Sequence, residues 1–354
     1  MKVIILAGGG GTRLFPLSRK SMPKQFLSID KEMSLLGETV LRFKAIVAPE
    51  DIVIVTNVAY ASHVQQELDE IDCPNAHIVT EPAARNTAPA IALAARYCQD
   101  KLGCDSSEVL FISTSDHIIR PMLSFQKTVL RSKKHAEAGH IVTFGIKPTK
   151  PETGFGYIET SDDNESVFKT LSFKEKPDLH PAKEYLAKGN YFWNSGMFSF
   201  TIGTYLSELA KYAPKISKLL KPGYDEIFDN FSAMPDISID YAVAEKSEVG
   251  VTIPLNLNWN DVGSWDAIYE IMEKDENNNA VKGDVIAIDS RENLFFGKNR
   301  LIAGIGVRNL MVVDTDDVVV VCHRGDSQKV KDLVGILKAD DRREPFEIVK
   351  KLVE

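Results

Sequence analysis

Four consecutive glycines near the start of the chain, Gly8 to Gly11, stand beside a group of cations that could bind phosphate. Five basic residues precede the first acidic residue, and they are Lys2, Arg13, Arg19, Lys20 and Lys24. The whole chain carries a formal net charge of −8, so this segment is a local positive site in an acidic protein. Glycine has no Cβ, and backbone N–H groups in such a loop can therefore face an anion or a base. The combination favours a polyphosphate substrate.

Two well-known phosphate-binding motifs do not fit this glycine run. A P-loop requires GxxxxGK[ST], whereas Thr12 and Arg13 follow the glycines here. A dinucleotide-binding loop requires GxGxxG at the start of a helix, but Arg13 occupies the third glycine position, and Pro16 and Pro23 disfavour a long helix. The interpretation that remains is an extended loop whose backbone faces an anion or a base. The alternative without a ligand is a tight turn among solvated lysines.

Two aspartates are candidates for a metal site. Asp116 follows an apolar run at 109–113, and a carboxylate at the carboxyl end of a parallel strand points into the crevice where open α/β sheets bind ligands. Asp261 lies in the segment WNDVGSW. Because Mg²⁺ is typically held by one or two carboxylates together with substrate phosphates, we expect both aspartates to bind it. Each could instead cap a helix, Asp261 the one expected at 264–272.

The elements expected around these residues alternate between strands and helices. Continuous apolar runs predict buried strands at 3–6, 52–55, 77–79, 109–113 and 141–144. Helical spacing predicts helices at 60–71, 87–101 and 124–137. This alternation is typical of βαβ units, so the expected fold class is α/β, a Rossmann-like, mainly parallel sheet with helices on both faces.

Mixed strands and helices are expected after residue 154. The strands lie in TGFGYIET, SVFKTLSFKEKP and NYFWNSGMFSF, and the helices at 181–188, 201–212, 224–231 and 239–246, the last opened by Asp240. A polar run at 274–279 then reads as a linker. We therefore predict a catalytic domain at 1–275 and a small β-rich, β-helix-like module at 280–354, with a helical tail at 327–338 and 345–353.

Composition excludes several classes of protein. The pI of about 5.5 argues against nucleic-acid binding, which normally requires a basic face. No apolar run approaches the length of a membrane span, and the four cysteines include no CxxC pair. These features predict a cytoplasmic protein that binds neither nucleic acid nor membrane.

Several motifs, taken together, identify a family. The segment LAGGGGTRLFPLSRKSMPKQF resembles the signature of sugar nucleotidyltransferases, and its SRxxxPKQF ending resembles mannose-1-phosphate guanylyltransferases. Further segments resemble the same family in the same order: EPAARNTAPA, TSDH, GFGYIE, FKEKP, WNSGMF, SIDYAVAEK and WNDVGSW. The resemblance implies transfer of GMP from GTP to mannose 1-phosphate with Mg²⁺, giving GDP-mannose and pyrophosphate.

The resemblance also implies roles for individual residues. Arg13, Lys24, Asp116 and Asp261 would be catalytic, with the two aspartates holding the metal. The nucleotide would contact Leu6, Ala7, Gly8, Gly9, Gly11, Thr12, Arg13, Asn86 and Thr87. The sugar phosphate would contact Gly156, Glu175, Lys176, Asn194 and Gly196. Neighbouring strand residues point to opposite faces, so Glu175 and Lys176 can reach one ligand only if the strand ends there; a structural ion pair between them is the alternative.

Two other functions stay open from the sequence. The protein could transfer a different nucleotide or act on a different sugar phosphate, or it could be a regulatory homologue without activity. The presence of Arg13, Lys24, Asp116 and Asp261 favours catalysis. The roughly 75 residues beyond the linker are too few for the isomerase domain of bifunctional relatives, so we expect the monofunctional form. The β-rich module suggests a homodimer.

Overall fold

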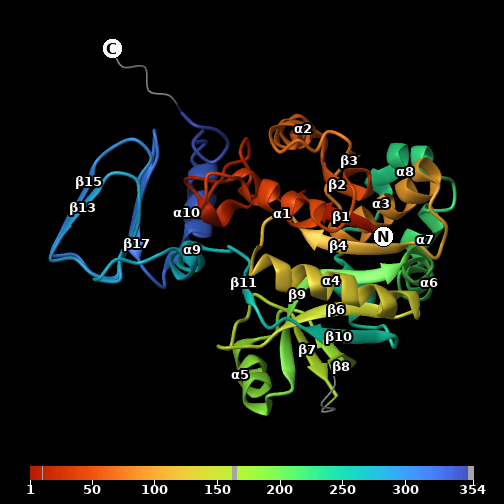
Figure 1. Cartoon of the computed structure of the whole chain (residues 1–354). Coiled ribbons are helices and arrows are strands. Elements are labelled where there is room, and N and C mark those ends of the chain that lie inside the picture. The colour runs from red at the N-terminus through yellow and green to blue at the C-terminus, as the bar shows by residue number, and fades with distance from the viewer. Residues whose placement is uncertain (10, 162–165, 350–354) are drawn as a thin grey trace. The chain divides into compact units, whose positions relative to one another are not determined.

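The computed structural model describes residues 1–9, 11–161 and 166–349, and its elements are labelled in Figure 1. The chain divides into two compact units. The first contains residues 1–8, 39–115 and 119–259, and the second contains residues 9–38, 116–118 and those from 260 onward. The division falls inside the glycine run, between Gly8 and Gly9. The predicted domain boundaries, 1–275 and 280–354, stay a prediction. The second unit contains residues of both predicted domains.

A nine-stranded sheet forms the centre of the first unit. Its strand order is β3-β2-β1-β4-β9-β6-β10-β8-β7. The bounds are β1 Lys2–Leu6, β2 Ile52–Asn57, β3 His77–Glu81, β4 Val109–Thr114, β6 Ile141–Ile146, β7 Tyr157–Thr160, β8 Phe168–Lys174, β9 Tyr191–Thr201 and β10 Gly250–Pro254. β3, β2, β1 and β4 pair in parallel, as do β6 and β10, while β9 runs antiparallel between β4 and β6. The α/β class with a largely parallel sheet is therefore confirmed.

Helices of the first unit pack on this sheet or on one another. They are α2 Ala61–Glu70, α3 Thr87–Leu102, α4 Met122–Glu137, α5 Leu179–Lys188, α6 Ile202–Tyr212, α7 Pro214–Leu219 and α8 Tyr224–Asn230. The helix α1 Leu35–Lys44 begins in the second unit and ends in the first. The alanine-rich α3 packs against β1, β2 and β3, because small side chains on its buried face allow a close approach. α4 crosses β4, β6 and β9 and lies in front of β6 and β9 in Figure 1. Within the described ranges, every helix is too short or too polar to traverse a lipid bilayer.

The second unit is built on short, mostly parallel strands. β12 Ala280–Lys282, β14 Leu294–Phe296 and β16 Leu310–Asp314 pair in parallel, β17 Val319–His323 closes that sheet, and β13 Val285–Ile288 pairs with β15 Ile302–Ile305. Buried Asn279 and Asn293 link successive coils, because Asn293 Nδ2 donates to Asn279 Oδ1 at 2.9 Å and Asn293 Oδ1 accepts from Leu310 N at 2.9 Å. This stacking of parallel coils confirms the β-rich module. The unit also contains α9 Trp265–Ile271 and α10 Val330–Ala339, while the short strands β5 Ile118–Arg120 and β11 Asn258–Asn260 lie at the boundaries of the two units.

Two predicted helices differ from the structure. The helix predicted at 345–353 is wrong over residues 345–349, where no helix forms, and the rest lies outside the described residues. The carbonyl groups of Pro345 and Phe346 accept hydrogen bonds from Lys20 N and Ser21 N instead of from a following helical turn. The helix predicted at 239–246 is a π-helical segment, Asp240–Ala244. Such segments are frequent at functional sites.

Candidate active site

Lys24 joins both predicted metal ligands in the second unit. Its ammonium nitrogen lies 2.8 Å from Asp116 Oδ2 and donates to the backbone carbonyl of Asp261. The Lys24 residue is 8% exposed, whereas the Asp116 side chain is 31% exposed. The lysine is thus fixed by two protein oxygens, and part of the aspartate stays accessible to a ligand.

Asp116 is ionised at neutral pH. Desolvation opposes its charge, but the Lys24 ammonium and the adjacent His117 outweigh this effect and hold the pKa of the carboxyl below its usual range. The alternative that Asp116 caps a helix does not apply, because the strand β5 follows it. His117 Nε2 lies 3.7 Å from Asp116 Oδ1.

A constrained turn holds Asp261. Val262 has a φ of 49°, which is unusual for a β-branched residue, and its N–H donates to Asn260 Oδ1 at 2.6 Å. Gly263 N donates to Asp261 Oδ1 at 3.1 Å, and a Cβ at Gly263 would lie 2.5 Å from Asp261 Oδ2. The glycine is therefore required for this carboxylate position. Ser264, not Asp261, caps α9 by accepting from Ala267 N.

The donor set of this cluster suits a hard divalent cation. The Asp116 carboxylate and the backbone carbonyl of Asp261 meet at one lysine, and oxygen atoms are the ligands that Mg²⁺ prefers. Within the described residues, no group of three or more histidine, cysteine, aspartate or glutamate side chains could hold a metal ion by itself.

The second half of the glycine loop leads directly to the cation side chains. Gly11 has a φ of 47°, and a Cβ there would lie 2.6 Å from Lys24 Cβ, so only glycine fits against the lysine. Thr12 and Arg13 form the 3₁₀ turn Thr12–Leu14. Arg13 is exposed, and no ion pair holds its guanidinium among the residues that the structure describes. Gly9 has open space beside it, and Gly10 lies outside the described residues.

The first half of the predicted nucleotide site belongs to the first unit. Leu6 O accepts from Ser115 N, Ala7 N donates to Val55 O, and Ala7 O accepts from Thr56 Oγ1. These backbone groups already form hydrogen bonds inside the fold. Leu6 and Ala7 therefore have fewer hydrogen-bonding groups for a nucleotide base than their position in the motif suggests.

Asn86 and Thr87 lie at the start of α3. Asn86 has a φ of 66° and accepts from Thr87 N at 2.9 Å, while Thr87 Oγ1 accepts from Ile239 N at 2.9 Å. Both side chains therefore have structural roles in this helix entry. Asn86 is nevertheless exposed, which leaves it accessible to a ligand.

Glu81 is a candidate site residue that the sequence analysis did not single out. It ends β3, is 7% exposed, and its Oε2 would lie 3.0 Å from a Cβ at Gly8. Burial raises the pKa of this carboxyl to about 7, and no hydrogen bond to it occurs among the described residues. Glu81 is the first residue of the EPAARNTAPA motif, and its place in that motif could have drawn attention to it.

The predicted sugar residues form a second cluster in the first unit. β8 ends at Lys174, and Lys176 has a φ of 46°. The strand therefore ends just before Glu175 and Lys176, as it must if both side chains are to reach one ligand. Glu175 Oε1 and Lys176 Nζ form an ion pair at 2.5 Å. This is the structural ion pair that the sequence analysis gave as the alternative to binding a sugar phosphate. A Cβ at Gly156 would lie 2.5 Å from Glu175 Oε2, so glycine is needed to admit this carboxylate.

Asn194 connects this cluster to Asp240. Asn194 Nδ2 donates to Asp240 Oδ1 at 2.9 Å, and Asn194 Oδ1 accepts from Gly196 N at 3.1 Å. Gly196 has a φ of 74°, which favours glycine at that position. Burial and the Glu175 charge raise the pKa of Asp240 to about 6. Asp240, expected to open a helix with contact to the substrate as the alternative, therefore belongs to the cluster.

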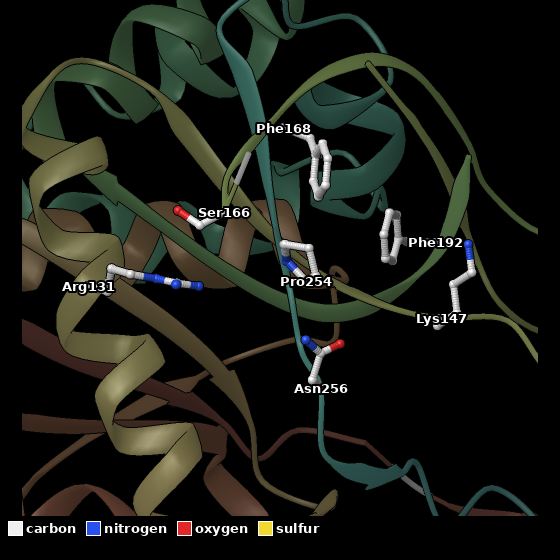
Figure 2. A pocket seen from close by; sticks show the side chains of 7 residues that line it. All are labelled: Arg131, Lys147, Ser166, Phe168, Phe192, Pro254 and Asn256. Carbon is white, nitrogen blue, oxygen red and sulfur yellow. The ribbon is translucent and has the colours of Figure 1, made fainter. Parts of the chain in front are cut away.

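A separate pocket in the first unit contains none of the predicted site residues. It is lined by Arg131, Lys147, Ser166, Phe168, Phe192, Pro254 and Asn256 (Figure 2). Lys147 Nζ lies 5.3 Å from the centre of the Phe192 ring. The predicted residues thus fall in two groups. The second unit contains Gly9, Gly11, Thr12, Arg13, Lys24, Asp116 and Asp261, and the first unit contains the others.

Comparison with known families identifies the class of protein. A nucleotidyl transferase family model matches residues 2–278, and a model of the mannose-phosphate isomerase/GMP-like β-helix domain matches residues 283–337. The chain therefore belongs to the nucleotidyl transferase family. It is an enzyme of a family that generally uses a divalent metal.

Individual relatives narrow the comparison further. The chain is 41% identical to a mannose-1-phosphate guanylyltransferase of Salmonella montevideo and 44% identical to the xanthan biosynthesis protein XanB of Xanthomonas campestris, in each case over 96% of this chain and 74% of the relative. A crystal structure from Thermus thermophilus, described as a mannose-1-phosphate geranyltransferase, aligns with a TM-score of 0.86 and 28% identity over 95% of this chain and 99% of that one.

Proposed function

We propose that this protein is a mannose-1-phosphate guanylyltransferase that uses GTP and Mg²⁺. The observation that carries the proposal is the contact of Lys24 with both the Asp116 carboxylate and the Asp261 backbone, because it brings a cation together with the two predicted metal-binding residues. The relatives that share about 40% of the sequence carry this activity in their names.

The proposed reaction requires no general base. A phosphate oxygen of mannose 1-phosphate, already ionised near neutral pH, attacks the α-phosphorus of GTP. The bond from that phosphorus to the α–β bridging oxygen breaks, and pyrophosphate leaves with the electron pair. The protein must hold two anions in line and neutralise the charge that moves to the leaving group.

Lys24 and Arg13 serve that neutralisation. Lys24 is a fixed point charge, since two protein oxygens set its position before substrate arrives. Arg13 is exposed and offers a planar fork of donors to phosphate oxygens. Asp116 and Asp261 would hold Mg²⁺, which when bound supplies charge stabilisation to the phosphates.

Glu81 explains a preference for guanine. A carboxylate accepts two hydrogen bonds side by side, and guanine presents adjacent N1–H and N2–H₂ donors on its Watson–Crick edge. Adenine and cytosine place a ring-nitrogen acceptor there, which the carboxylate repels. Because Glu81 is buried beside Gly8 and lacks a partner among the described residues, a bound guanine would satisfy it.

The Glu175 cluster supplies acceptors for sugar hydroxyls. Glu175 and Asp240 are carboxylates, and Asn194 adds an amide that already touches Asp240. Lys176, 56% exposed at its side chain, is available to the sugar phosphate. Hydroxyl groups of a hexose could be held by these acceptors, while the phosphate meets the ammonium.

The test is a matrix of nucleotides and sugar phosphates. Purified protein is incubated with Mg²⁺, each of GTP, ITP, ATP, UTP and CTP, and each of mannose, glucose and fucose 1-phosphate, and pyrophosphate release is measured. We expect release with GTP and mannose 1-phosphate. ITP lacks the N2 amino group and should be used about 10- to 100-fold less efficiently. Efficient release only with another pair would replace this proposal by transfer of a different nucleotide or sugar.

The role of Glu81 has its own variant and control. Glu81→Gln should reduce the GTP-to-ITP preference toward unity, because one of the two acceptors is lost. Glu208→Gln removes another buried carboxylate of the same unit, 8% exposed, and should keep the preference of the unsubstituted protein. An unchanged preference in Glu81→Gln would remove guanine recognition from Glu81 without affecting the proposed reaction.

A further inference from the structure

Arg19 belongs to the same basic segment as Arg13 and Lys24, but its surroundings are different. It is 1% exposed, so it cannot reach a dissolved phosphate. Its Nε donates to Pro16 O at 2.9 Å, and its two terminal nitrogens donate to Asp317 Oδ1 and Oδ2 at 2.6 and 2.7 Å. This is a bidentate pair between Arg19, which lies in the loop that follows β1 within the signature segment (residues 7–26, here called the signature loop), and Asp317, which follows β16.

The same guanidinium also holds the C-terminal segment. Arg19 Nη1 donates at 2.8 Å to the backbone carbonyls of both Glu344 and Glu347. Asp317 Oδ2 in turn accepts from Val349 N at 2.8 Å. The buried pair therefore fastens residues 343–349, which we call the C-terminal strap, by main-chain contacts at both of its ends.

Main-chain hydrogen bonds continue this attachment along the signature loop. Lys20 N donates to Pro345 O at 3.2 Å, and Ser21 N donates to Phe346 O at 2.8 Å. Arg19 and Met22 exchange N–H···O bonds at 2.9 and 3.1 Å, which closes a tight turn. Lys24 follows this turn by two residues, so the strap is bonded to the turn that fixes where Lys24 emerges.

The β-rich module packs on the same loop. Leu14, Phe15 and Leu27 are buried in one core with residues of β14, β16 and α10. Trp265 Nε1 donates to Phe15 O at 3.0 Å from the helix that follows Asp261. The loop thus has most of its tertiary support from residues beyond 260.

We propose that the C-terminal strap, locked through the Arg19–Asp317 pair, is a positioning element that keeps Lys24 and Arg13 in place for nucleotidyl transfer. This inference rests on the proposed function of these two cations. Arg19 and Asp317 are positioning residues that touch no substrate, and the β-rich module acts in catalysis as well as in packing. The family model of the transferase ends at residue 278, so this contribution lies outside the segment that the model describes.

The central variant is Asp317→Asn, which keeps the side-chain shape and removes the charge that Arg19 requires. We expect kcat for nucleotidyl transfer to fall about 10- to 100-fold, as small displacements of catalytic groups do. KM for mannose 1-phosphate should stay within about 2-fold, since a displaced loop lowers the rate and not sugar binding.

Asp316→Asn is the matched control. Asp316 is the preceding residue and pairs with Lys298 at 2.7 Å and Asn299 at 2.8 Å, not with the loop. It should retain the kcat of the unsubstituted protein. Equal losses in both variants, or a rise in KM for mannose 1-phosphate as large as the fall in kcat, would indicate general loss of structure and overturn the proposal.

Hydrogen exchange provides a readout that does not depend on activity. In Asp317→Asn, amides of residues 19–26 should exchange about 10-fold faster or more, whereas those of β1 and β4 should exchange as before. Unchanged exchange at 19–26 would refute the strap, even if the protein proved to transfer another nucleotide. Faster exchange with full kcat would show that the strap exists but does not position the cations, and it would overturn the catalytic role.

Discussion

Replacement of Glu81 by glutamine should stabilise the ligand-free protein at alkaline pH. Glu81 is buried beside Gly8 and has no hydrogen-bond partner among the described residues. Its pKa is raised to about 7 from an ordinary value of 4.5, with desolvation as the cause. The folded state therefore bears the cost of a buried charge once this carboxyl ionises.

The magnitude follows from the displacement of the pKa. A shift of about 2.5 units corresponds to about 3 kcal/mol of free energy of unfolding. Between pH 4.5 and 7 the folded state binds the proton more tightly than the unfolded state, so stability falls as the pH rises through this range. Above pH 7 the loss is complete. Glutamine carries no charge at any pH and so escapes it.

The assay is thermal unfolding of both proteins at pH 5 and pH 8 without nucleotide. At pH 8 the Glu81→Gln protein should melt several degrees higher than the unsubstituted protein, and at pH 5 the two should nearly coincide. Equal differences at both pH values would refute the reasoning, because a packing effect does not depend on protonation. With GTP present, KM should rise in the unsubstituted protein as the pH falls through 7, and Glu81→Gln should lack this dependence.

Three further predictions concern single contacts. Lys24→Met should lower kcat about 100- to 1,000-fold by removing charge stabilisation that is set in advance, and steady-state kinetics with a loss below about 3-fold would contradict that role. Gly156→Ala should raise KM for mannose 1-phosphate, because the new Cβ would lie 2.5 Å from Glu175 Oε2. Gly154→Ala is its control and should leave KM unchanged, because its Cβ would meet only the flexible Glu152 carboxylate at 3.3 Å. Asn293→Leu should cost about 1–3 kcal/mol for each buried partner left unpaired, and a urea-unfolding midpoint equal to that of the unsubstituted protein would exclude the asparagine link between coils.

The order of elements and the identity of the cation cluster were accessible from the sequence. Apolar runs and alanine-rich helical spacing depend on local pattern, and β1, β2, β4 and α3 lie where that pattern predicts them. The family motifs also identified Lys24, Asp116 and Asp261, and in the structure the Lys24 ammonium contacts both aspartate residues.

Features that depend on distant partners could not be predicted. Residues 345–349 carry helical spacing, but their carbonyls are bonded to a turn near residue 20, and local propensity contains no information about that contact. Glu81 is the first residue of the EPAARNTAPA motif, but the motif does not show that its carboxyl is buried against Gly8. The sequence pattern around Asp240 predicts only the start of a helix. Its hydrogen bond with Asn194 joins residues 46 positions apart, and a local pattern contains no information about such a contact.

Transfer of the nucleotidyl group can be followed directly with isotope-labelled substrate. Mannose 1-phosphate that carries oxygen-18 in its non-bridging phosphate oxygens is incubated with GTP, Mg²⁺ and the protein, and both products are analysed by mass spectrometry. Attack of the sugar phosphate on the α-phosphorus predicts GDP-mannose that retains all of the label and pyrophosphate that contains none. Label in pyrophosphate, or GDP-mannose without it, would contradict the proposed reaction.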